Sequence, residues 1–113
     1  MPSYEIIIGR MLKDGRVAVT NNSATDVPLG TTFITAFWTS AEMVDGEFHN
    51  RESGTIADID LTLKSVDVFR RQVECIPKGY SAAVELAGSG LSTVLLWLDL
   101  PRQKTIQIIL RAT

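Results

Sequence analysis

The sequence contains few of the residues that stabilise small domains through disulfide bonds or metal ions. Cys75 is its only cysteine and His49 its only histidine, so the chain has neither an internal disulfide nor a thiolate zinc cluster. We expect Cys75 to be a small core residue in a reducing compartment. The longest apolar run, residues 94–98, is far too short to span a membrane. The N-terminus lacks a basic region followed by an apolar stretch, which predicts a cytoplasmic protein.

A strong excess of charge of either sign is also missing. Eleven Lys and Arg residues stand against 13 Asp and Glu residues, which gives a net charge near −2. This balance argues against a dedicated duplex-DNA-binding protein, whose affinity depends on many phosphate contacts. The chain has no Gly-x-x-x-x-Gly-Lys-Ser/Thr motif and no Gly-x-Gly-x-x-Gly motif after a strand, so we expect neither nucleotide hydrolysis nor a bound cofactor.

Polar residues gather in the segment 41–54, which we expect to form a long loop inserted into the domain. Its carboxylates are of the kind that hold hard cations, but their spacing matches no calcium-binding loop. We therefore expect a solvated loop without a metal ion. A small enzyme that uses residues 42–52 stays open as an alternative function. The acidic residues and the histidine of this segment are Glu42, Asp45, Glu47, Glu52 and His49.

The dominant pattern in the rest of the chain is an alternation of apolar and polar residues. It is clearest at 56–66, 82–86 and 106–110, and a period of two is typical of half-buried strands. Pro and Gly residues separate these runs, which predicts one all-β domain over residues 1–113, an antiparallel barrel or sandwich. The side chains expected to point into its core are Ile59, Leu61, Leu63, Val84, Leu86, Ile106, Ile108 and Leu110.

Several other segments also favour strands. Asp14-Gly15 is suited to a tight turn between two apolar runs, and residues 31–39 are rich in sheet-forming residues. Residues 91–100 and 104–112 are predicted to be two further strands. Residues 66–76 are ambiguous, since their apolar residues also follow helical spacing, but we favour a strand that leaves the sheet.

Two segments carry a resemblance to a known family. Gly15-Arg16-Val17 followed by Val27-Pro28-Leu29-Gly30 is one, and residues 66–71 followed by Gly79 and residues 84–88 are the other. Together they resemble the second domain of translational GTPases, the family of elongation factor Tu. The resemblance implies a Greek-key antiparallel barrel of six or more strands. The GTPase domain itself has no counterpart in this sequence, so the implied function is binding and not hydrolysis.

The resemblance also implies where a partner would bind. In the family, an acidic residue and an arginine of the second segment lie near the terminal nucleotide of tRNA, and the matching positions are Asp67 and Arg70. The family's Asp-Asn pair after the glycine turn matches Tyr80 and Ser81. An exposed Asp67–Arg70 ion pair without a binding role is the plainer interpretation of the same residues.

We therefore expect a non-catalytic binding module that resembles a translation-factor barrel and contacts a protein partner. The alternative is a module that binds RNA ends or tRNA, for which the slightly acidic charge is less suited. Its predicted binding residues are Asp67, Arg70, Arg71, Lys78 and Tyr80, with Phe69 or Tyr80 available for stacking.

Self-association is a further expectation. Residues 94–98 would be apolar on both faces of a strand, whereas a strand of a lone barrel should present polar groups to water on one face. Leu95 and Trp97 would form the outward pair. Because the segment 41–54 is too polar to cover them, we expect an oligomer or another partner there.

Overall fold

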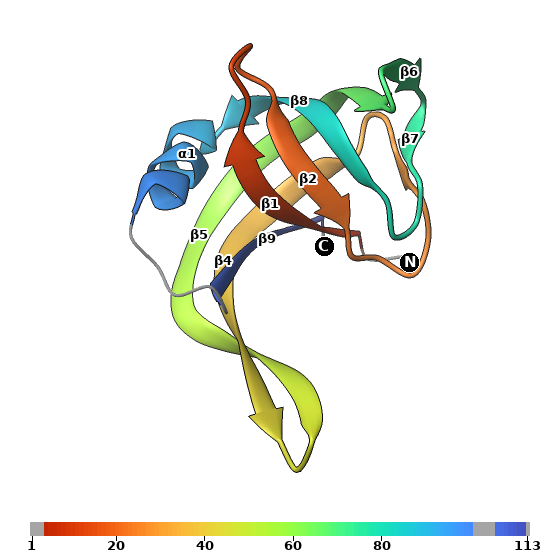
Figure 1. Cartoon of the computed structure of the whole chain (residues 1–113). Helices are drawn as coiled ribbons and strands as arrows, with labels where there is room; N and C mark the ends of the chain where they lie inside the picture. The colour runs from red at the N-terminus through yellow and green to blue at the C-terminus, as the bar shows by residue number, and fades with distance from the viewer. Residues whose placement is uncertain (1–3, 101–105, 113) are drawn as a thin grey trace.

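The computed structural model describes residues 4–100 and 106–112, and within them the side chains of 41–44 and 47–55 are outside the description. The elements follow the turn signals of the sequence closely (Figure 1). They are β1 (Glu5–Met11), β2 (Val17–Asn21), β3 (Val27–Pro28), β4 (Thr32–Val44), β5 (Glu47–Val68), β6 (Arg71–Val73), β7 (Cys75–Ile76), β8 (Ser81–Ser89), α1 (Leu91–Asp99) and β9 (Ile106–Arg111).

Six strands close into a hydrogen-bonded ring. Their order is β4-β9-β1-β2-β8-β5, and β5 pairs with β4 to complete it. Every pairing is antiparallel, and β6 folds back onto the end of β5 while β3 and β7 form a separate short ladder. The expectation of an antiparallel sheet that closes on itself is confirmed, but the fold is mostly β with one short helix and not all-β, and the ring is barrel-like and not a regular barrel.

The interior of the ring holds the side chains that the alternation placed there. Leu61, Val84 and Leu110 are fully buried, and the other predicted core residues are buried as well, except for Ile106, which is half-buried. Ile109, which breaks the alternation of β9, is also buried. It lies opposite Phe37 on the outer side of the ring, so β9 carries apolar groups on both faces.

The segment 41–54 is not a loop. It forms the far ends of β4 and β5, which continue as a two-stranded hairpin beyond the end of β9 (Figure 1). The two-residue turn is Asp45-Gly46, with positive φ at both residues, as a type I′ hairpin turn requires. Polarity misled the sequence analysis because a projecting hairpin faces water on both sides. The predicted acidic site of 42–52, including His49, lies largely outside the described side chains.

The segment 91–100 is a helix, and the expectation of a strand is wrong. A continuous apolar run fits either element, and here the spacing of the buried Val94 and Trp97 is helical. The helix packs against β1, β8 and β9, with Trp97 edge-on to Trp38 at 6.0 Å between ring centroids. Trp97 is therefore buried and Leu95 half-buried, so the two do not form an outward pair; Leu96 is the exposed residue.

Glycine residues at and just after the end of β8 allow the chain to pass close to β5 before α1 begins. Gly90 has a φ of 93°, and a Cβ there would lie 2.5 Å from the side chain of Ile59. Gly88 has a φ of 137°, and a Cβ there would collide with the carbonyl oxygen of Asp60. Both positions need glycine for the space and for the backbone conformation.

The ambiguous segment 66–76 contains no helix, as the favoured interpretation held. β5 ends at Val68, a tight turn follows, and β6 and β7 return along the ring. Cys75 was expected to be a core residue, and this prediction is wrong. It lies in β7, is only half-buried and does not belong to the core cluster. Its pKa is raised, first by partial burial and then by the nearby carboxylate of Asp26.

A buried asparagine ties the two-stranded β3–β7 ladder to the ring. The Asn21 side chain is 2% exposed, and its amide donates to the carbonyl oxygens of Thr25 and Ile76 at 3.0 and 2.8 Å. Its Oδ1 accepts from the backbone N–H of Ser23 at 2.8 Å. The three bonds hold the chain between β2 and β3 against β7.

Candidate functional site

The larger of two shallow hollows on the described surface lies across four neighbouring strands. Arg10 of β1 is opposite Ala18 of β2, Ala18 is opposite Ala83 of β8, and Ala83 is opposite Asp67 of β5. Residues opposite one another in antiparallel strands share a face. The two small alanines therefore form a low floor between longer side chains at either end, a groove of about 330 Å³.

Two β-bulges place the ends of this row on the outer face. In β1 the side chains of Ile6 and Ile8 point inward, and simple alternation would turn Arg10 inward as well. The pairing shifts by one residue between Ile8 and Arg10, which turns Arg10 outward. A second shift in β5, between Leu63 and Ser65, does the same for Asp67. Bulges that re-aim side chains are common beside functional sites.

The β5–β6 turn forms one wall of the groove and is conformationally unusual. Val68 pairs with Arg71, so the turn consists of Phe69 and Arg70 alone. Both have positive φ, 52° and 65°, a conformation in which bulky residues are rare. The other two-residue turn with these dihedral angles uses Asp45-Gly46, the favoured residues. The chain thus contains a relaxed and a strained version of the same turn.

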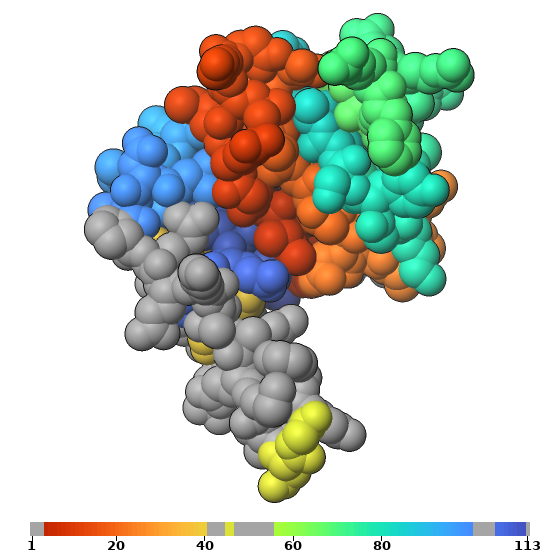
Figure 2. Space-filling view, in the orientation of Figure 1, coloured from red at the N-terminus to blue at the C-terminus, as the bar shows by residue number. Residues whose placement is uncertain are grey.

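The strained turn also exposes an aromatic side chain. Phe69 is 84% exposed, which is unusual for a side chain of this size. Its ring lies edge-on to that of Tyr80, with 6.2 Å between centroids and 81° between planes. In Figure 2 β8 lies between the β1–β2 hairpin, in red and orange, and the β5–β6 segment, in green. We call the groove, together with the Phe69-Arg70 turn, the groove surface.

The electrostatics of the groove surface differ from those of the whole chain. The Arg16 guanidinium pairs with the carboxylate of Asp67 and, at 2.8 Å, with that of Asp14. The backbone N–H and the guanidinium of Arg16 lower the pKa of Asp14, and these carboxylates raise the pKa of Arg16. Asp67 therefore pairs with Arg16 and not, as the plainer interpretation had it, with Arg70.

Two of the three arginines that line the groove lie outside the ion pairs of the described residues. Among the residues that the structure describes, neither Arg10 nor Arg70 forms an ion pair, although both line the groove. The groove lining holds three arginines and one aspartate, whereas the chain carries a net charge of −2. The local field therefore favours a negatively charged partner.

The structure brings together some of the predicted binding residues and not others. Asp67 and Arg70 line the groove and Tyr80 adjoins it through Phe69. Arg71 is exposed in β6 and does not line the groove. Lys78 lies in the turn before β8, where its backbone N–H donates to Asp26 at 2.8 Å. Sequence reasoning missed Arg10, because only the bulge in β1 turns it outward.

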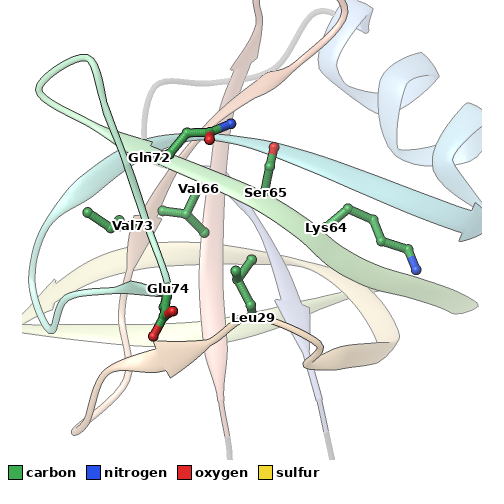
Figure 3. Close-up of a pocket in the computed structure, with 7 residues that line it drawn as sticks. All are labelled: Leu29, Lys64, Ser65, Val66, Gln72, Val73 and Glu74. Atoms are coloured by element: carbon green, nitrogen blue, oxygen red, sulfur yellow. The ribbon is translucent and has the colours of Figure 1, made fainter.

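A second, smaller hollow lies between β5, β6 and the loop after β3 (Figure 3). Its volume is about 230 Å³, and its apolar part comes from Leu29, Val66 and Val73. Figure 3 shows Lys64 extending away from the other lining side chains. Ligand pockets usually exceed about 300 Å³ and have polar groups that converge, so this hollow is the weaker candidate.

Other kinds of site find less support. Among the side chains that the structure describes, which leave out 41–44 and 47–55, no group of three or more His, Cys, Asp or Glu residues could hold a metal ion. None of the helices described is long and apolar enough to cross a membrane. No protein-family model, curated protein or solved structure matches the chain.

Proposed function

We propose that this protein is a non-catalytic, cytoplasmic binding module that contacts a protein partner through the groove surface. The observation that carries the proposal is the Phe69-Arg70 turn. Non-glycine residues in the left-handed region cost about 1–3 kcal/mol each, and such strain clusters at functional sites. Aromatic residues and arginine are also the usual anchors of protein interfaces.

The resemblance to the second domain of translational GTPases forms part of this proposal. Gly15 lies in the hairpin between the ring strands β1 and β2, and Gly30 lies in the turn between β3 and the ring strand β4, which fits the two turns that the resemblance implies. Asp67 and Arg70, the positions matched to the family's RNA-end contacts, both line the groove. These placements support a barrel of that type acting without a GTPase domain.

A second candidate, a module that binds RNA ends, is favoured by one observation. Phe69 precedes Arg70 in the turn and its ring contacts that of Tyr80, and aromatic rings next to arginines are used to bind single strands. Asp67 and Asp14 weaken this candidate, because they pair with Arg16 and so interrupt the continuous basic track that a nucleic-acid backbone would follow.

Affinity capture from an extract of the native cells tests the proposal. Immobilised wild-type protein is compared with a Phe69→Ala/Arg70→Ala variant and with a Lys64→Gln control, whose change lies in the smaller hollow. We expect proteins that the wild type and the control retain and the double variant loses, with or without ribonuclease. Equal capture by all three proteins would contradict the proposal. Capture that ribonuclease abolishes would favour the RNA candidate.

A further inference from the structure

The groove has a form that restricts what it can hold. Its floor follows one row of residues across four strands, from Arg10 through Ala18 and Ala83 to Asp67. Neighbouring strands lie about 4.8 Å apart, so the row spans about 14 Å between its end Cα atoms. An extended peptide advances about 3.3 Å per residue and would cross the row in about four residues.

The positive charges at the two walls of the groove are two separate arginine side chains. Arg16 is paired with both Asp14 and Asp67, which leaves Arg10 at one wall and Arg70 at the other as the groove arginines outside an ion pair. Arginine binds carboxylates through a planar, often bidentate, pair of hydrogen bonds. Two separated guanidinium groups suit two separate carboxylates. A nucleic-acid backbone instead needs a continuous basic track, and Asp67 interrupts this one.

We propose that the groove binds an extended acidic segment of a partner protein that carries an acidic side chain for each of the two walls. One carboxylate pairs with Arg10 and the other with Arg70. The small side chains of Ala18 and Ala83 admit the segment's backbone between the walls, and Phe69 covers one side of it. This inference rests on the proposed function and names the chemistry of its partner.

A titration followed by the amide and arginine Nε resonances of the labelled protein tests the inference. The probes are a ten-residue Gly/Ser/Gln peptide with glutamates at positions 3 and 7, the same peptide with glutamines there, and decauridine. We expect the glutamate peptide alone to shift resonances of Arg10, Ala18, Arg70 and Ala83, and 0.5 M salt to weaken its binding.

Matched variants locate the charges involved. We expect Arg10→Gln and Arg70→Gln each to weaken binding of the glutamate peptide about tenfold, since each removes one charge-assisted pair. Lys64→Gln removes the same charge in the smaller hollow and should leave binding unchanged. Equal weakening by Lys64→Gln would overturn the inference, because it would indicate general charge attraction.

Several other results of the titration would also overturn the inference. Shifts confined to other residues, equal binding of the glutamine peptide, or no binding at millimolar concentration would each overturn the acidic-segment inference. Decauridine that binds the same residues more tightly than the glutamate peptide would overturn it in favour of RNA. A failure of the acidic-segment inference can be told apart from a failure of the proposed function. If only the inference is wrong, the protein still captures a partner protein, and that capture still depends on Phe69 and Arg70.

Discussion

Replacing Phe69-Arg70 by Asn-Gly should make the protein more stable. Both native residues lie in the left-handed region, at φ of 52° and 65°, at about 1–3 kcal/mol each. Asn and Gly adopt this conformation readily. The variant loses the edge-on Phe69–Tyr80 contact, worth about 0.5–1.5 kcal/mol. The difference is a gain of roughly 0.5–5.5 kcal/mol in the free energy of unfolding.

Urea unfolding followed by tryptophan fluorescence measures this gain, because Trp38 and Trp97 are in contact across the interface between α1 and the ring. The midpoint should rise without a change in the slope of the transition. Phe69→Ala/Arg70→Ala is the matched control, since it removes the aromatic contact and keeps side chains with a Cβ in the turn. The control should be no more stable than the wild type. An Asn-Gly variant that is equally or less stable would refute the idea that the turn stores strain.

Three further predictions concern the scaffold and its charges. Asn21→Ala should lower the free energy of unfolding by about 2–4 kcal/mol, because it leaves the buried carbonyl oxygen of Ile76 and two part-buried backbone groups, of Thr25 and Ser23, without the Asn21 partner. An effect below about 0.5 kcal/mol in urea unfolding would contradict this. Gly88→Ala should lower the melting temperature far more than Ala87→Gly, because its Cβ would meet the Asp60 carbonyl oxygen; equal shifts in thermal unfolding would show that the close approach is unimportant. The pKa of Asp14 is lowered, so its contribution to stability is complete above the ordinary aspartate pKa of about 3.9 and is lost as the pH falls through its lower folded value. Urea unfolding between pH 5 and pH 2 should therefore show a smaller acid-dependent loss for Asp14→Asn than for the wild type, and equal losses would exclude this role.

The alternation of the sequence was sufficient to predict the strands that line the interior. Leu61, Leu63, Val84 and Leu86 are buried as expected, because a period of two leaves one face of a strand apolar. The run at 94–98 has no such alternation, and it was wrongly predicted to be a strand. An apolar run without alternation fits a helix as well as a strand, and only its position over the ring favours the helix.

The candidate site was less accessible to sequence reasoning. Asp67, Arg70 and Tyr80 came from a resemblance, whereas Arg10 and Arg16 became visible only with the strand order. The bulges in β1 and β5 change which face a residue occupies, and the sequence has no clear mark for either of them. The strain at Phe69 is likewise a property of the backbone, which the residue types alone do not reveal.

Site-specific photocrosslinking tests the central claim most directly. A photoreactive phenylalanine analogue at Phe69, which is 84% exposed, is compared with the same analogue at Ile34, which is 46% exposed on β4. After irradiation in the native cells, we expect a discrete crosslinked protein from position 69 and none from position 34. Identical products from both positions, or no protein product from position 69, would contradict a protein-binding role for the groove surface.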